Sequence, residues 1–325
     1  MESHARIYVA GHSGLAGSAI LHRLTSGGYR NIVTRTHKEL ELTDTRAVKA
    51  FFESEKPEYV FLAAAKVGGI LANKTRPADF IHSNLAIQTN VIHEAWHNGV
   101  KRLLFLGSSC IYPRDCPQPI KEEYLLTGPL ESTNRAYAIA KIAGVETCRS
   151  YNQQYGSCDL AVMPTNLYGP GDNYDPESAH VLPALIRKMH EAKTRGIDRV
   201  VIWGTGSPRR EFLHSDDMAD ACVMMMNLQE GAFRDLLQGP NGFPLMNIGC
   251  GEDQTVADLA RTVASVVGFR GALEFDASKP DGTPRKLLDV SRLRRLGWSP
   301  RVDLKSGIAA AYKDYLAREG ALANR

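Results

Sequence analysis

Four side chains that can carry chemistry lie within one short stretch of the chain. Ser108 and Cys110 follow the apolar run LLFL, and Tyr137 and Lys141 are four residues apart in RAYAIAKIAG. At 3.6 residues per turn, Tyr137 and Lys141 lie on the same face of a helix. An ammonium near a phenol favours the phenolate and lowers the tyrosine pKa below its ordinary value of about 10. A serine hydroxyl can bind the same substrate oxygen, so this trio is typical of a carbonyl reductase.

The thiol two residues after Ser108 is an addition to that machinery. A lone cysteine is usually a small buried hydrophobe, but Cys110 lies beyond a strand's carboxyl end, where open α/β sheets bind ligands. A thiolate there can remove a proton next to a carbonyl group. His180, after the loop GPGDNYDPESA, is a candidate acid for the opposite face of the same carbon. From the residues alone, the structural and the catalytic interpretation of the thiol both stay open.

These side chains need a scaffold, and the sequence predicts an α/β one. Apolar segments rich in β-formers alternate with helix-like segments through the first half of the chain. This pattern predicts a Rossmann-type, doubly wound parallel sheet flanked by helices. After residue 168 the regular alternation gives way to a loop rich in Gly, Pro, Asp and Asn, and the later segments suggest a smaller α/β substrate domain. We expect a cofactor domain of residues 1–166 and 211–252 and a substrate domain of residues 167–210 and 253–325.

A glycine motif follows the first predicted strand. Gly11, Gly14 and Gly17 would allow a tight turn, close approach of a pyrophosphate and close helix–strand packing. Directly after the first strand of an alternating chain, the motif predicts a dinucleotide site; a structural glycine turn is the alternative. The small residues that end FLAAAKVGG suit a backbone that lies under a dinucleotide, or core packing alone.

Basic residues follow the second predicted strand. Arg35, His37 and Lys38 stand where a fold selective for NAD usually carries an acid, so they suit the 2′-phosphate of NADP. A solvated basic turn is the alternative. Asp44 could bind the adenine amine or cap the following helix, and both roles could hold.

Several cations in the second half of the chain are possible binders of a diphosphate. Each alone is more often a solvated charge, and Trp203 could stack on a purine or fill the core. The cations are Arg187, Lys188, Arg209, Arg210, Arg285 and Lys286.

Composition excludes several classes of function. The chain has 325 residues, a formal charge of +3 and 23% charged residues, which is too mild a balance to argue for nucleic-acid binding. Six scattered cysteines without a CxxC pair predict reduced thiols, no metal site and a cytoplasmic protein. The amino-terminal sequence has no signal-peptide pattern and no run of 18 apolar residues occurs, so we expect no membrane span.

Several segments together resemble a known family. GHSGLAGSAI, FLAAAKVGGI, FLGSSCIYP, the YAIAK helix, MPTNLYGP, AHVLPALIRK, REFLH and SKPDGTPRKLLDV are similar to the extended short-chain dehydrogenase/reductases. SSCIYP and KPDGTPRKLLDV are specific to the subgroup that epimerises C3 and C5 of GDP-4-keto-6-deoxy-D-mannose and reduces C4 with NADPH. The resemblance runs nearly from end to end and implies that reaction here.

The resemblance also assigns residues. It implies that Ser108, Tyr137 and Lys141 are the reductase trio, with Cys110 as the epimerisation base and His180 as the acid. The implied NADPH/NADP contacts are Gly11, Ser13, Gly14, Leu15, Gly17, Arg35, His37, Lys38, Asp44, Ala64, Leu106, Gly107, Lys141, Pro164, Asn166 and Leu167. The implied GDP-sugar contacts are Asn166, Arg187, Lys188, Trp203, Arg210, Asp281 and Lys286. A homodimer formed through the YxxxK helix and its neighbour is implied as well.

Three positions depart from the pattern of the subgroup. Members often have arginine where Ser13 and His37 stand, near the 2′-phosphate, and where Lys188 stands, near the diphosphate. These departures bear on cofactor preference and affinity and leave the chemistry unchanged.

Three other functions share this fold. A 4,6-dehydratase needs an Asp–Glu pair where this chain has Ser–Cys. A non-catalytic NADP(H)-binding protein typically loses the tyrosine or the lysine, and both stand here. A GDP-L-colitose synthase, acting on a 3,6-dideoxy substrate, uses the same residues and stays an alternative.

Overall fold

The centre of the molecule is a parallel sheet, as the alternating pattern predicts. The computed structural model describes residues 1–176, 178–279 and 281–323. Six parallel strands form this sheet in the order β10-β5-β4-β3-β1-β2. They are β1 (Ile7–Ala10), β2 (Ile32–Val33), β3 (Tyr59–Leu62), β4 (Arg102–Leu106), β5 (Asp159–Pro164) and β10 (Leu245–Ile248).

Helices cover both faces of this sheet, which explains why its strands are almost continuously apolar. Successive strand residues alternate between the two faces: Val9 belongs to one core, and Tyr8 and Ala10 belong to the other. The first core also holds α1 (Leu15–Ser26), α7 (Ser215–Met226) and α8 (Glu230–Leu237). The second holds α2 (Thr45–Glu55), α4 (Pro77–His97) and α5 (Arg135–Tyr155).

The order of the strands predicts a ligand crevice at the carboxyl ends of β1 and β3. From β1 the chain first adds β2 on one side and then β3, β4 and β5 on the other. Open α/β sheets bind ligands at such a switch point. The turn at Gly11 follows β1, the segment at Ala64 follows β3, and Ser108 follows β4.

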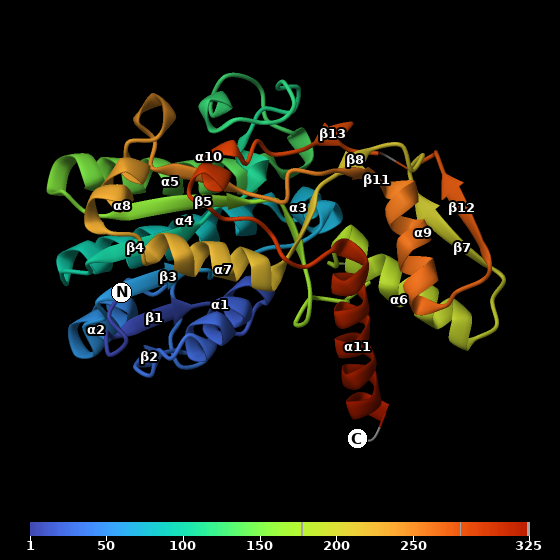
Figure 1. The fold of residues 1–325 in the computed structure, drawn as a ribbon, viewed down its shortest axis with the longest axis horizontal. Coiled ribbons are helices and arrows are strands. Elements are labelled where there is room, and N and C mark those ends of the chain that lie inside the picture. The colour runs from blue at the N-terminus through green and yellow to red at the C-terminus, as the bar shows by residue number, and fades with distance from the viewer. Residues whose placement is uncertain (177, 280, 324–325) are drawn as a thin grey trace.

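A second lobe packs around its own core, formed largely by segments after residue 167 (Figure 1). Its elements are α6 (Val181–Thr194), β7 (Arg199–Trp203), α9 (Val256–Val267), β12 (Ala272–Asp276) and α11 (Leu304–Ala323). Strands β7 and β12 pair in parallel, and α6 and α11 both pack against α9. Figure 1 shows this lobe at one end of the sheet, with α11 running down beside it to the carboxyl terminus.

Short elements join the two lobes. The three-stranded sheet comprises β8 (Arg209–Arg210), β11 (Gln254–Thr255) and β13 (Arg285–Lys286), and β6 (Asn166–Tyr168) pairs with β9 (Phe212–His214). The remaining elements are α3 (Ile70–Thr75), α10 (Ser291–Arg295) and the 3-10 helices η1 (Ser109–Ile111), η2 (Glu122–Tyr124), η3 (Ser132–Asn134) and η4 (Pro240–Gly242). Leu293 and Trp298, although late in the chain, pack into the core of the main sheet.

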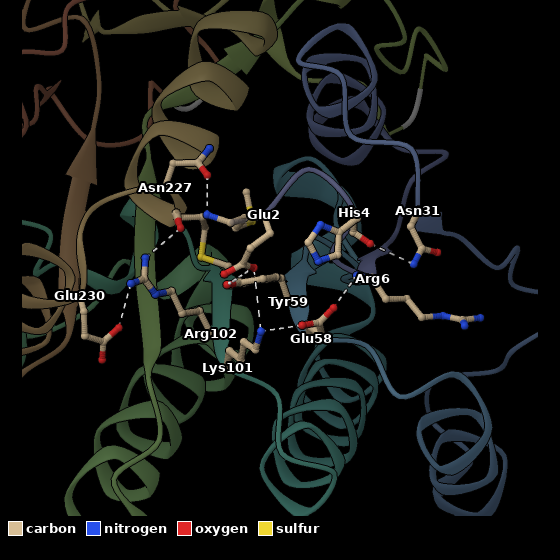
Figure 2. A network of polar contacts seen from close by, with 12 residues as sticks. Glu2, His4, Arg6, Asn31, Glu58, Tyr59, Lys101, Arg102, Asn227 and Glu230 are labelled. Atoms are coloured by element: carbon tan, nitrogen blue, oxygen red, sulfur yellow. Dashed lines mark hydrogen bonds and ion pairs between the residues drawn. The ribbon is translucent and has the colours of Figure 1, made fainter.

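A polar network closes the sheet at the amino ends of its strands, the edge opposite the crevice (Figure 2). The buried guanidinium of Arg102, at the start of β4, donates to the carbonyl oxygens of Met226 at 2.9 Å and Leu228 at 2.7 Å. It also pairs with Glu230 at 2.9 Å, while Lys101 beside it pairs with Glu58 at 2.6 Å. Arg102 thereby satisfies carbonyls at the end of α7 and just after it that the helix itself leaves unpaired. This edge stabilises the fold and is remote from the crevice.

Within the residues that the structure describes, no helix is both long and apolar enough to cross a membrane. All six cysteines are free thiols.

Candidate active site

Ser108 and Tyr137 meet at the carboxyl end of β4. Ser108 caps η1, where its Oγ accepts a hydrogen bond from the Cys110 amide at 3.3 Å. The Tyr137 side chain, on the first turn of α5, interacts with the Ser108 side chain and packs edge-on against Phe80, with ring centroids 6.3 Å apart. The two hydroxyl groups that the sequence assigns to one substrate oxygen are therefore adjacent.

Lys141 lies one helical turn after Tyr137, in the interior of the protein. Its Nζ donates to the Leu106 carbonyl at 2.8 Å and lies 5.9 Å from the centroid of the Tyr137 ring. It also lies 4.7 Å from the centroid of the Phe105 ring. Burial disfavours the ammonium and lowers the pKa of Lys141 to about 7. The side chain is therefore held in place, and at neutral pH it is protonated in only part of the molecules.

The pKa of Tyr137 moves in the direction opposite to the one predicted from the sequence. Burial of the phenol raises the pKa well above its ordinary value, and the nearby Cys110 raises it further, while the hydrogen bond with Ser108 lowers it. Burial outweighs the other effects because a phenolate loses its hydration in this site. In the protein alone Tyr137 is therefore protonated at neutral pH, which is the state required of a proton donor.

Two donors converge on the sulfur of Cys110. Asn134 Nδ2 lies 3.1 Å from Sγ, and Lys286 Nζ lies 3.5 Å from it. The three side chains line one small cavity. An amide donor and a cation at a sulfur atom both stabilise negative charge on it. This environment differs from that of Cys148 and Cys222, which are buried in apolar cores where burial raises the thiol pKa.

His180 lies beside the same cation. It is the N-cap residue of α6, and its side chain makes no capping hydrogen bond. Part of the residue is exposed to solvent, but surrounding protein atoms desolvate the ring, and this effect together with the charge of Lys286 lowers the His180 pKa. Lys286 therefore connects Cys110 and His180, although the three residues are far apart in the chain.

The glycine motif forms a turn that admits no larger side chain. Gly11 has a φ of 82°, and a Cβ atom there would lie 2.6 Å from the Ala64 nitrogen. A Cβ on Gly17 would lie 2.1 Å from the Gly11 carbonyl oxygen. Gly14 is the N-cap of α1 and has no side chain to cap it, while Ser13 is exposed and Leu15 begins the helix. The close approach and the uncapped helix amides fit a dinucleotide diphosphate.

The basic residues after β2 are partly engaged by neighbouring acids. The Arg35 guanidinium pairs with Glu55 and lies 5.6 Å from the centroid of the Phe51 ring. His37 pairs with Glu41 at 2.8 Å. Lys38 is exposed and has no ion pair among the described residues.

Asp44 caps α2. Its carboxylate accepts hydrogen bonds from the Arg46 and Ala47 amides at 2.9 and 3.1 Å. This is one of the two roles considered from the sequence, and an adenine contact stays a prediction.

The remaining predicted cofactor residues line the ends of β4, β5 and β6. Gly107 allows close packing, because a Cβ atom there would lie 1.9 Å from the terminal methyl carbon of Met163. Asn166 donates to the Glu211 carbonyl at 2.8 Å, so its side-chain nitrogen is held by the protein. Pro164 ends β5 and is buried, and Leu167, in β6, is half-buried.

Trp203 marks a second part of the site, on the smaller lobe. It is 62% exposed, which is unusual for an indole. The ammonium groups of Lys188 and Lys279 lie 5.6 and 5.7 Å from the centroid of its ring. An exposed aromatic ring flanked by two cations suits a purine nucleotide.

Arg210 and Lys286 face each other across β8 and β13, on the side of that sheet that leads towards Cys110. They are cross-strand partners, so their side chains lie on one face. Within the described residues neither forms a salt bridge with a carboxylate, and Arg210 donates only to the carbonyls of Arg209 and Asp281. Facing like charges destabilise a sheet, so this pair suits an anionic ligand.

Two predicted substrate contacts have other partners in this structure. Asp281 accepts from the Thr205 amide at 2.7 Å and its hydroxyl at 2.8 Å, and so shapes the loop after Trp203. Arg187 pairs with Glu191 at 2.7 Å and donates to the Tyr174 carbonyl at 3.0 Å. These contacts engage the Arg187 guanidinium within the protein.

Asn134, Glu211 and Lys279 were not predicted from the sequence. Asn134 precedes Tyr137 by three residues, which places it near that side chain, but this spacing does not indicate its contact with Cys110. Glu211 is fully buried, accepts hydrogen bonds from the Gly251 and Leu288 amides, and positions Asn166 through its carbonyl. No local pattern indicates that role.

Comparisons with known proteins agree with this geometry. Residues 7–235 match the NAD dependent epimerase/dehydratase family. The chain is 57% identical to GDP-L-fucose synthase 1 of Arabidopsis thaliana, over 97% of this chain and 94% of that protein. It is 52% identical to the GDP-L-fucose synthase of Escherichia coli (strain K12), over 98% of each chain.

Two further proteins extend the comparison. The GDP-L-colitose synthase of Yersinia pseudotuberculosis is 36% identical over 96% of this chain and 98% of that protein. The GDP-mannoheptose C4 reductase MlghC of Campylobacter jejuni, solved with NADP bound, superposes with a TM-score of 0.87 at 42% identity, covering 97% and 99% of the two chains. The chain therefore belongs to the NAD dependent epimerase/dehydratase family, in the branch that contains the GDP-L-fucose synthases.

Proposed function

We propose that this protein is a bifunctional, NADPH-dependent enzyme that converts GDP-4-keto-6-deoxy-D-mannose into GDP-L-fucose. It epimerises C3 and C5 of the sugar and reduces the ketone at C4. The observation that carries this proposal is the junction at Ser108–Cys110, where a thiol with two donors adjoins the reductase trio. The names and high identities of the plant and bacterial relatives support the same reaction.

Epimerisation uses the two groups on either side of Lys286. The ketone at C4 makes the hydrogens on C3 and C5 acidic, and Ser108 and Tyr137 donate hydrogen bonds to the oxygen of the resulting enolate. The Cys110 thiolate takes the proton from carbon and becomes a thiol. His180 gives its ring proton to the opposite face of the same carbon, which inverts the centre. Exchange with solvent restores both groups before the second carbon reacts.

Reduction uses the tyrosine as the proton donor. NADPH, when bound, supplies the hydride for C4. The raised pKa keeps the Tyr137 phenol protonated at neutral pH, so it can give its proton to O4. Ser108 holds the same oxygen, and Lys141 is fixed one turn below by the Leu106 carbonyl.

The residues of the crevice fit NADP. The turn at Gly11 and the uncapped amino terminus of α1 would hold the diphosphate. Lys38 and Arg35 are the cations available to the 2′-phosphate, although Arg35 is already paired with Glu55. Because Ser13 and His37 replace arginines common in the subgroup, selectivity for NADP rests on fewer cations here.

The GDP moiety fits the smaller lobe. Trp203 offers an exposed face for guanine, and Lys188 lies beside it. Arg210 and Lys286 face the crevice without carboxylate partners in the described part of the chain and would bind the diphosphate. Asn166 would contribute to the site of the sugar. Asp281 would contribute by holding the loop after Trp203, through its hydrogen bonds with Thr205. We assign Arg187 to the support of α6, through Glu191, and not to direct contact.

One assay with product identification tests the reaction. The protein is incubated with NADPH and GDP-4-keto-6-deoxy-D-mannose, and the product is identified by NMR. Cys110→Ser should still bind NADPH but lose epimerisation, and Tyr137→Phe should abolish hydride transfer. Normal turnover by Cys110→Ser would overturn the assignment of the base, and near-normal reduction by Tyr137→Phe would overturn that of the donor.

GDP-L-colitose synthesis is the second candidate, because it calls for the same side chains. The identity of 36% to a colitose synthase, against 57% to a plant fucose synthase, favours the fucose reaction. Running the same assay with the 3,6-dideoxy substrate compares the two. A higher kcat/KM for that substrate would reverse the order.

The division of labour between the lobes is a further part of the proposal. We assign the cofactor to residues 1–166 and 211–252, and the GDP-sugar to residues 167–210 and 253–325. The separate core around α6, α9 and α11 supports this division, although Leu293 and Trp298 join the core of the main sheet. A ternary crystal structure with the cofactor bound on the smaller lobe would contradict it.

We also propose a cytoplasmic homodimer. Six free thiols suit a reducing compartment, and recovery of the tagged full chain in an exported fraction would argue against it. Helix α5 carries Tyr137, and α4 is its neighbour. We propose the outer surface of these two helices as the dimer contact. Stacked aromatic residues on that surface support this assignment.

A further inference from the structure

Asn134 makes a direct contact with the thiol of Cys110. Its Nδ2 lies 3.1 Å from Sγ, closer than the Lys286 ammonium at 3.5 Å. Asn134 and Cys110 belong to different elements, η3 and η1, and line the same cavity. The contact therefore depends on tertiary packing and is not made within a local turn.

Asn134 does not perform the usual task of an asparagine at its position. It is the N-cap residue of α5, where an asparagine oxygen normally accepts a hydrogen bond from the helix amides. Here the side chain makes no capping hydrogen bond. Its Oδ1 is buried and has no partner among the described residues. The side chain thus gives up a stabilising interaction in favour of the sulfur contact.

We propose that Asn134 is the positioning residue of Cys110, holding Sγ towards the substrate and stabilising the thiolate by donating a hydrogen bond to it. This inference rests on the proposed role of Cys110 as the epimerisation base. Asn134 lies three residues before Tyr137 on the same helical stretch. It therefore fixes the position of the epimerisation base relative to that of the reductase phenol.

The direction of the hydrogen bond determines which substitution is informative. A thiolate can only accept, so it needs the N–H donor that an amide supplies. A carboxylate of the same shape can only accept, and its negative charge opposes a thiolate. Asn134→Asp therefore preserves the size of the side chain and reverses its effect on the sulfur.

The first measurement follows the thiol without using turnover. Alkylation of Cys110 by iodoacetamide is measured against pH, by peptide mass spectrometry on the full-length protein. In Asn134→Asp the pH midpoint of alkylation should rise by about one unit or more, since hydrogen bonds to charged groups are among the stronger ones. Cys116 serves as the internal control. It is a half-buried free thiol, and within the described part of the chain Asn134 forms no hydrogen bond with it.

A matched substitution controls for the added charge. Gln153→Glu makes the same amide-to-carboxylate change at an exposed position of α5 and should leave the Cys110 midpoint unchanged. Where Asn134→Asp fails to fold, as judged by circular dichroism and NADPH binding, Asn134→Ala replaces it. The alanine variant removes the donor without adding charge, so we expect a smaller shift in the same direction.

The second measurement follows the epimerisation step. Incorporation of solvent deuterium at C3 and C5 of GDP-4-keto-6-deoxy-D-mannose, without reduction, should fall about tenfold or more in Asn134→Asp, while the Kd for NADPH stays unchanged. An unshifted alkylation midpoint in both Asn134 variants would overturn the inference, whatever the substrate is. Absence of deuterium exchange in the wild-type protein, together with a shifted midpoint, would instead overturn the proposed reaction and leave the positioning role standing.

Discussion

Lys286 acts on both side chains that are proposed to exchange protons with the sugar. It donates to Cys110 Sγ at 3.5 Å, and its charge lowers the pKa of His180. A cation at this place disfavours the imidazolium. In the free protein His180 therefore becomes protonated only at a lower pH than an ordinary histidine. An anionic diphosphate bound to Lys286 would offset its charge and raise the pKa of His180.

The effect of Lys286 on His180 can be measured without substrate. In Lys286→Met we expect the His180 pKa to rise, because one of the two causes of its depression is removed. It should remain below the ordinary value of about 6.5, because the ring is still desolvated. A histidine NMR titration of the wild type and the variant measures the midpoint. Lys279→Met, which removes a cation of the same lobe near Trp203, is the control and should leave the midpoint in place.

Catalytic pH dependence follows from the same two groups. Epimerisation needs Cys110 deprotonated and His180 protonated, so its rate should fall at both pH extremes. The lowered pKa of His180 decreases the fraction of imidazolium at any given pH, and so lowers the epimerisation rate near neutral pH. Lys286→Met should raise that fraction, by the amount that the histidine titration measures.

At the scale of elements, the turn between β1 and α1 is the most tightly constrained part of the cofactor site. The first turn of α1 approaches the Gly11 carbonyl so closely that only glycine fits at position 17. This approach holds the amino terminus of α1 at the end of β1, where a diphosphate would bind. Packing of the turn and binding of the cofactor therefore depend on the same contact.

Gly17→Ala should damage both stability and binding. The added methyl group would lie 2.1 Å from the Gly11 oxygen, so α1 must move away from the strand. We expect a loss of about 1–3 kcal/mol in the free energy of unfolding, the usual cost of overpacking. NADPH affinity, followed by fluorescence titration, should fall at least about tenfold.

Gly231→Ala is the matched control for this prediction. It lies in α8, and a Cβ there meets nothing within 4 Å. Alanine in a helix is more stable than glycine by about 0.5–1 kcal/mol, so this variant should be slightly stabilised in urea and bind NADPH normally. Equal behaviour of the two variants would show that the turn does not constrain the site.

At the scale of the whole molecule, the carboxyl and amino ends of the parallel strands, here called the carboxyl and amino edges of the main sheet, have different roles: the first binds ligands and the second stabilises the fold. The carboxyl edge carries Ser108 and the glycine turn, and Lys286, from β13, reaches Cys110 there. The amino edge is closed by Arg102 and its partners, which tie β4 to the end of α7 and to α8 (Figure 2). The outer surface of α4 and α5 belongs to neither edge, and it is where we propose that a second subunit binds.

An aromatic group on α4 and α5 allows the proposed dimer to be tested. Trp96 and Tyr155 stack with ring centroids 4.1 Å apart, although Tyr155 is 45% exposed. Tyr155→Glu should weaken self-association, because it places a charge in the proposed apolar contact, and sedimentation velocity across a concentration series measures this. Ile197→Glu is the control, since Ile197 is equally exposed, at 45%, but lies after α6 on the other lobe. A wild-type protein that remains monomeric throughout the series would rule out the dimer.

Much of this architecture could be predicted from local sequence. The strand segments, the glycine turn and the spacing of Tyr137 and Lys141 are local patterns, and the structure contains the predicted parallel sheet. Contacts between segments distant in the chain could not be predicted in this way. Asn134 and Lys286 reach Cys110 from separate parts of the chain, and nothing near residue 110 indicates either.

The sequence by itself determined the fold class, the dinucleotide turn and the types of group that do the chemistry, because these depend on periodicity and on short spacings. The tertiary structure decided the charge states and the partners. Burial raised the pKa of Tyr137, where spacing to Lys141 had predicted a lower one. Packing paired Arg187 with Glu191 and left Arg210 facing Lys286. Desolvation and charge pairing depend on what surrounds a group in space, and that neighbourhood forms only when distant segments pack together.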